Sequence, residues 1–139
     1  MSWKGKYTPE EKIRIFTFCI DSYKRLLADG DYGFYACRLS ERQQDLAFQY
    51  AKLEAREACL ASLREAAEMA VRFDTRGVTK RTSLLVERCD DDPKDTTKNH
   101  TDNECRRRLN ALGDKVFDFV REDAQFTAIR DLLTAHASA

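Results

Sequence analysis

Glycine and proline are scarce in this sequence, which has only five Gly and two Pro among 139 residues. Strand-rich sandwiches and barrels need many tight turns, and such turns depend heavily on these two residue types. By contrast, 35% of the residues are charged, a composition typical of long amphipathic helices. The sequence therefore predicts an all-α protein, and its length suits one domain with a self-sufficient core.

Net charge is also lacking, because 24 Lys and Arg residues balance 24 Asp and Glu residues. Domains that bind nucleic acids usually carry a strong positive field, so we expect no direct contact between this segment and DNA or RNA. No apolar run approaches the roughly 18 residues of a membrane span, and the N-terminus lacks the apolar core of a signal peptide. We therefore expect a cytoplasmic protein that has no contact with membranes.

Closely spaced cysteine pairs are missing as well. The five cysteines (Cys19, Cys37, Cys59, Cys89 and Cys105) include no C-x-x-C motif, which is typical of reduced thiols in a cytosolic protein. Cys89, His100 and Cys105 offer three zinc ligands, but their spacing matches no established zinc finger. Asp90–Asp92 lacks the glycine-punctuated alternation of a calcium loop. We expect no metal and no cofactor.

Groups for catalysis are few. A nucleophilic mechanism needs a base within hydrogen-bond reach of a Cys or Ser, and the only histidines, His100 and His136, fall in an expected loop and near an expected frayed end. Arg106–Arg108 occupies three consecutive helix positions that point in different directions, so pairing with nearby acids is expected rather than phosphate binding. We expect a protein without catalytic residues, with a small enzyme as the remote alternative.

Helix signals divide the chain into about five helices. The first is expected from a capping box at Thr8 and Glu11 to about Leu27, with Gly30 as its stop. It carries two apolar stripes, which predicts packing on two sides. The second is expected over about 32–53, with an exposed polar stretch at 40–45, and the third over about 56–73, with a break at Gly77.

The second and third of these helices are predicted to pair as an antiparallel hairpin. Their apolar residues recur three and four positions apart, so the two stripes can interlock. The residues concerned are Leu46, Ala47 and Tyr50 on one side and Cys59, Leu63 and Ala66 on the other.

The last third of the chain has weaker signals. A short ordered segment at Thr82–Val86 and a surface loop through Asn99 are expected, followed by a capping box at Thr101 and Glu104 that starts a helix to about Leu112. A turn at 115–120 leads to a final helix from Asp123 to His136. We therefore divide one domain, 1–139, into helical hairpins at 8–73, an irregular segment at 74–100 and capping helices at 101–137.

Segment 40–73 resembles a tetratricopeptide repeat, although Glu54 stands where such repeats often have Gly. The resemblance implies a repeat-like fold with an inner groove lined by four side chains of the second helix, and an ordinary helical hairpin with a solvated face remains the alternative. The four residues are Glu41, Gln44, Phe48 and Lys52. The final segment resembles the closing element of repeat arrays, whose apolar residues would cover the open edge of the preceding helices. They are Phe117, Val120, Phe126, Ile129 and Leu133.

A wider resemblance covers nearly the whole chain. It is carried by the segments 7–12, 82–86, 92–93, 97–99 and 117–126, together with Asn103. These segments are similar to the C-terminal helical regions of XRE-type helix-turn-helix transcriptional regulators of clostridial gut bacteria. The DNA-binding domain of that family, expected upstream, is missing, and Ala124 replaces the Pro usual in the closing segment.

The resemblance implies a non-catalytic ligand- or protein-sensing domain of a bacterial transcriptional regulator. Its partner would be a protein, a peptide or a small-molecule effector, and DNA would be reached only through the missing domain. A homodimer is plausible for such a regulator, because paired DNA half-sites require two-fold symmetry. A free-standing protein-interaction adaptor is the alternative.

Overall fold

The computed structural model describes residues 7–27, 32–33, 35–76 and 102–138, together with the backbone of residues 79–80 and 90–91. The described helices are α1 (Pro9–Leu26), α2 (Tyr35–Lys52), α3 (Arg56–Asp74), α4 (Glu104–Ala111), the 3-10 helix η1 (Lys115–Val120) and α5 (Ala124–His136). Two short strands, β1 (Thr79–Lys80) and β2 (Asp90–Asp91), pair antiparallel between α3 and α4. The prediction of an all-α protein with about five helices is confirmed.

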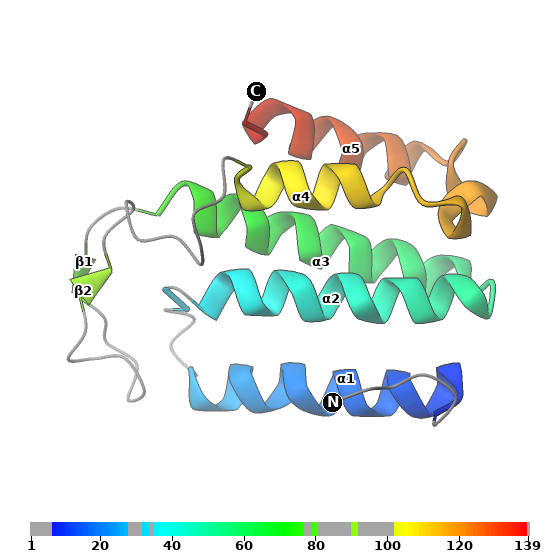
Figure 1. Cartoon of the computed structure of the whole chain (residues 1–139), viewed down its shortest axis with the longest axis horizontal. Coiled ribbons are helices and arrows are strands. Elements are labelled where there is room, and N and C mark those ends of the chain that lie inside the picture. The colour runs from blue at the N-terminus through cyan, green and yellow to red at the C-terminus, as the bar shows by residue number, and fades with distance from the viewer. Residues whose placement is uncertain are drawn as a thin grey trace.

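The helices lie side by side in chain order, with α1 at one edge and α5 at the opposite edge (Figure 1). The hairpin of α2 and α3 forms the most extensive helix pair, and α3 also packs against α4 and α5. The main core is shared by α2, α3, α4, η1 and α5. A smaller core around Ile20, Leu39 and Leu46 joins α1 to α2.

The start of α1 follows the local signal in the sequence. The Thr8 hydroxyl accepts a hydrogen bond from the Glu11 amide at 3.2 Å, and the Glu11 carboxylate accepts one from the Thr8 amide at 3.1 Å, so the predicted capping box is confirmed. The prediction that this helix is packed on two sides is wrong. Ile20 is buried against α2, whereas Phe18 on the opposite face is 72% exposed. The reason is position: α1 is the edge helix of the described fold, and α2 is its main neighbour (Figure 1).

The predicted interlock of the hairpin is confirmed, since Leu46, Ala47, Cys59, Leu63 and Ala66 are buried and Tyr50 packs partly buried against the same core. One expectation for α2 is wrong: the polar stretch 40–45 is not on exposed turns throughout.

Ser40 and Gln43 are buried, at 0% and 6% exposure. Ser40 tolerates burial because its hydroxyl donates a hydrogen bond to the Ala66 carbonyl across the hairpin, at 2.7 Å. A polar residue in this stretch therefore contributes a contact between α2 and α3, which the polar pattern alone does not predict.

The turn between α2 and α3 contains Glu54 in the left-handed region, with φ 53°. Such a conformation costs a residue with a Cβ roughly 1–2 kcal/mol, whereas Gly adopts it freely. The position at which the sequence departs from the repeat pattern is thus the one at which the backbone favours Gly.

The C-terminal helices cover α3 as predicted. All five apolar residues assigned to the closing element are buried, led by Phe126 at 0% and Phe117 at 1% exposure. The capping residues of α5 were also predicted correctly, because the Asp123 carboxylate accepts a hydrogen bond from the Gln125 amide.

The capping box predicted for α4 is wrong, since Asn103 caps this helix and Glu104 is buried. Gly30, Gly77, Thr101 and the segments Thr82–Val86 and 92–99 lie outside the described residues. Within the described part of the chain, no helix is both long and apolar enough to cross a membrane.

Candidate functional site: a groove between α2 and the α4–η1 corner

The four side chains predicted to line a groove lie along one face of α2, but the structure divides them. Gln44 and Phe48 border a hollow of about 290 Å³. Lys52, one turn further on, borders a second hollow of about 470 Å³. Glu41 lies at the other end of the face, where its carboxylate pairs with Arg38 at 3.6 Å and Arg42 at 3.5 Å.

The first hollow has an aromatic floor and an amide rim. The Phe48 ring meets the Phe117 ring edge to face, with 6.4 Å between centroids. The opposite wall belongs to the end of α4 and the turn after it, and Gln44 and Asn110 place carboxamide groups at its border. The lining residues are Gln44, Phe48, Asn110, Ala111, Asp114 and Phe117.

The second hollow continues along the same side of the molecule. Lys52 extends back over the Phe48 ring, with its ammonium nitrogen 4.9 Å from the ring centroid, so this side chain connects the two hollows. The opposite wall is the start of η1. The lining residues are Ala51, Lys52, Leu53, Glu54, Lys115, Val116, Asp118 and Phe119.

Arg121 fixes the corner at which α4 turns into η1. Its guanidinium donates hydrogen bonds to the Leu112 carbonyl at 2.9 Å and the Asp114 carbonyl at 3.0 Å, and it pairs with the Asp118 carboxylate at 2.8 Å. Three acceptors on one rigid guanidinium hold the backbone on both sides of the turn. The wall of the groove is therefore preorganised.

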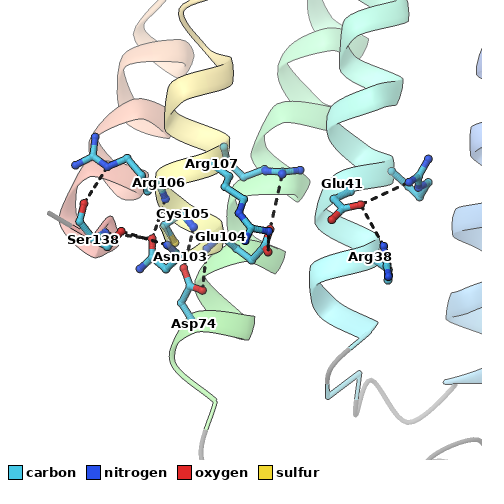
Figure 2. Close-up of polar contacts among 11 residues, drawn as sticks. Arg38, Glu41, Asp74, Asn103, Glu104, Cys105, Arg106, Arg107 and Ser138 are labelled. Atoms are coloured by element: carbon cyan, nitrogen blue, oxygen red, sulfur yellow. Dashed lines mark hydrogen bonds and ion pairs between the residues drawn. The ribbon is translucent and has the colours of Figure 1, made fainter. Parts of the chain in front are cut away.

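The N-terminus of α4 is anchored by two neighbouring elements (Figure 2). The Asp74 carboxylate at the end of α3 accepts hydrogen bonds from the amides of Glu104 at 3.1 Å and Cys105 at 2.8 Å. The Asn103 side chain accepts from the Arg106 amide at 2.9 Å, as an N-cap, and from the Ser138 amide at 3.1 Å. A carboxylate beside the first amides of a helix, which have no partner within the helix, also interacts favourably with the helix dipole.

Buried charges line the face of α4 that is directed toward α2. Glu104 is 2% exposed and Arg108 is 8% exposed. The Glu104 carboxylate pairs with Arg107 at 2.8 Å and Arg108 at 3.7 Å. Figure 2 shows Glu104 and Arg107 on α4 with Glu41 on α2 across from them. The expectation that the arginine triplet pairs with acids is confirmed for Arg107 and Arg108.

Burial is the main cause of the pKa shifts of Glu104, Arg108 and Asp45. It raises the pKa of Glu104 above the ordinary carboxyl range, and Arg108 and Arg107 oppose that shift. It lowers the pKa of Arg108, against the attraction of Glu104, Glu41 and Asp45. It also raises the pKa of Asp45, with Arg42 as the main opposing charge. The ion pairs of Glu104 lie within α4, and the attraction of Glu41 and Asp45 for the Arg108 guanidinium reaches across to α2. Because these charges are costly to bury, we assign them a structural role.

The described cysteines have the properties of packing residues. Cys37, Cys59 and Cys105 are buried, Cys19 is half-buried, and all four are free thiols. Burial raises the pKa of the Cys37 and Cys59 thiols to about 12, and burial together with the hydrogen bond to Asp74 raises that of Cys105. A thiol in this state is a poor nucleophile and metal ligand at neutral pH.

The zinc hypothesis falls mostly outside the described residues, because Cys89 and His100 are not among them. Within the described ranges no group of three His, Cys, Asp or Glu residues could hold a metal ion. The sequence did not predict that Asn110, Asp114 and Phe117 line this hollow, because all three lie after α3 in the sequence and face α2 only in the folded chain. Periodicity along α2 predicts which of its residues share a face, but it cannot predict which element lies across from that face.

Comparisons with protein-family models, curated proteins and solved structures found no match to this chain.

Proposed function

We propose that this chain is a non-catalytic recognition domain that binds an extended segment of another protein in the groove between α2 and the α4–η1 corner. The observation that carries the proposal is the hollow at Phe48, which has an aromatic floor and carboxamide groups at its border. A carboxamide both donates and accepts hydrogen bonds, so Gln44 and Asn110 suit the alternating N–H and C=O groups of a peptide backbone.

The size of the hollow favours a peptide over a small-molecule effector. Sites for drug-sized ligands enclose about 300–1,000 Å³ and bury most of the ligand. The hollow of about 290 Å³ is at the lower limit and is partly open to solvent. It suits one apolar side chain of a longer ligand, with the rest of the peptide continuing past Lys52 toward the second hollow.

The resemblance to C-terminal regions of XRE-type regulators supports a more specific proposal, namely a sensor domain of a bacterial transcriptional regulator with a tetratricopeptide-like hairpin. An antibody raised against this domain would test it in the native cells. A band distinctly larger than the 16.1 kDa chain would support the regulator. A band of the same size would contradict it and favour the free-standing adaptor.

The groove is tested with peptides selected from a random displayed library on the purified chain. Affinity would then be measured by fluorescence anisotropy for the chain and for the double variant Gln44→Ala, Asn110→Ala. Two lost hydrogen-bonding groups should weaken binding by about 1–3 kcal/mol in total, or roughly fivefold to 150-fold. Gln125→Ala is the matched control, because Gln125 borders a different surface, on the α3–α5 side.

Charge reversal at the two ends of the α2 face is a second test. Glu41→Lys combined with Lys52→Glu keeps the net charge constant and changes exposed or half-buried groups. We expect weaker peptide binding with an unchanged circular dichroism spectrum. Selected peptides that bind this variant and the carboxamide variant as tightly as the original chain would contradict the groove assignment.

A further inference from the structure

We propose that the outer face of α1 is a homodimer interface, in which two copies of this chain pair their α1 helices antiparallel about Phe18. This inference goes beyond the groove, because α1 is the edge helix of the described fold and contributes no residue to either hollow (Figure 1). Its starting point is an unusual exposure: Phe18 is 72% exposed and Leu26 is 55% exposed on a helix whose other side packs on α2.

The outer face is divided into an apolar flank and a charged flank. In a regular α-helix with 3.6 residues per turn, Phe18 lies opposite the buried Ile20 side. Ile15, Cys19 and Leu26 then fall on one flank of Phe18. Arg14 and Asp21 fall on the other, and both are exposed.

The outer faces of two α1 helices match one another when the helices run antiparallel. A two-fold axis perpendicular to the helix at Phe18 keeps each flank on its own side and reverses the direction of the chain. The apolar flank therefore meets the apolar flank of the second copy. On the charged flank, Arg14 comes within about 1.5 Å, along the axis, of Asp21 from the second copy, because the two residues lie four before and three after Phe18.

The ends of the face are complementary in the same way. Glu11 and Arg25 lie equally far before and after Phe18, so each Glu11 faces an Arg25 of the other copy. A parallel pair would instead place the apolar flank against the charged flank and Arg25 against Arg25. Like charges in direct apposition are unfavourable, so the charge pattern favours the antiparallel pair.

The length of α1 limits the strength of the dimer. Its 18 residues form a face about 27 Å long and about 10 Å wide. Two such faces together cover only about 540 Å², well below the roughly 1,200 Å² at the low end of standard specific interfaces. We therefore expect a weak, reversible dimer with a dissociation constant on the order of 100 µM.

Sedimentation equilibrium of the full chain from about 5 to 500 µM tests the proposal, since this range brackets a dissociation constant on the order of 100 µM. The chain should change from monomer to dimer, and Phe18→Glu should remain monomeric. Leu53→Glu is the control, because Leu53 is also exposed, at 40%, but lies in the turn after α2. A chain that is monomeric throughout, or a dimer unaffected by Phe18→Glu, overturns the proposal.

Exchanging charges tests the antiparallel register. Arg14→Asp or Asp21→Arg alone should weaken the dimer on the order of tenfold, because each places like charges opposite one another twice. The double variant Arg14→Asp, Asp21→Arg should restore it. If the losses of dimer affinity in the two single variants simply add in the double variant, the proposed register is contradicted.

Oxidative cross-linking separates the two orientations, in a chain whose Cys19 and Cys89 are changed to Ser. Phe18→Cys should form a disulfide-linked dimer, because the two positions meet at the axis. Ser22→Cys should not, because in an antiparallel pair its two copies lie about 12 Å apart along the helices. Efficient cross-linking of Ser22→Cys would show a parallel pair and overturn the proposal.

Discussion

The carboxylate of Asp74 is expected to control the stability of the helix that forms one wall of the groove. It accepts hydrogen bonds from the backbone amides of Glu104 and Cys105, two residues that are 2% and 0% exposed. Hydrogen bonds to a charged group contribute about 1.5–3 kcal/mol each, and an amide left buried without a partner costs a similar amount. Because the two bonds share one side chain, we expect Asp74→Ala to cost about 3 kcal/mol of unfolding free energy.

Asp74→Asn separates the contribution of the hydrogen bonds from that of the negative charge. Its single carbonyl oxygen can still accept one amide, and it loses the interaction of a negative charge with the helix dipole. The expected cost is about half that of Asp74→Ala. Asp131→Ala is the matched control, since it removes an exposed carboxylate of α5.

Urea denaturation at 25 °C, followed by circular dichroism, gives the free energies, and hydrogen exchange locates the change. For a domain of this size, 3 kcal/mol corresponds to a decrease in Tm of about 6–12 °C. Exchange should increase mainly in α4 and the adjoining turn. If Asp74→Ala stays within about 0.5 kcal/mol of the original chain, the range usual for neutral surface substitutions, the anchoring role is refuted.

Phe126, Glu54 and Cys19 each provide a separate test of the fold. Phe126→Ala should cost about 3–5 kcal/mol by leaving a cavity in the core, and an unchanged Tm would contradict its burial. Glu54→Gly should raise the unfolding free energy by up to about 1 kcal/mol, because relief of the left-handed conformation outweighs the added chain entropy; a loss of stability would contradict this. At pH 8, a thiol reagent should label Cys19 in the folded chain well before Cys37 and Cys59, whose pKa of about 12 leaves about one thiolate in ten thousand. Peptide mapping by mass spectrometry checks this, and equal labelling rates would refute it.

Features that depend on adjacent residues were predictable from the sequence. The capping box at Thr8 and Glu11 and the N-cap at Asp123 are satisfied within one turn of the helix, so their signals are complete in a few letters. The interlocking stripes of α2 and α3 were also predictable, because a short turn makes the two helices antiparallel neighbours.

Features that depend on tertiary neighbours were not predictable. The sequence at the start of α4 predicted a local capping box. In the structure Asp74 and Ser138, both distant in sequence, form hydrogen bonds with the first residues of this helix, and the Glu104 carboxylate pairs with arginine side chains instead. Ser40 looked exposed because its acceptor, Ala66, lies on another helix. The apolar outer face of α1 predicted a packing partner that the described part of the fold does not supply, and this difference is the basis of the dimer proposal.

The groove is tested most directly by ¹⁵N NMR titration of the chain with a selected peptide. The account predicts that the largest chemical-shift changes lie at Gln44, Phe48 and Ala111 and extend toward Lys52, with little change along the outer face of α1. Changes centred instead on the α3–α5 surface around Arg64 and Gln125 would contradict the central claim that the groove is the recognition site.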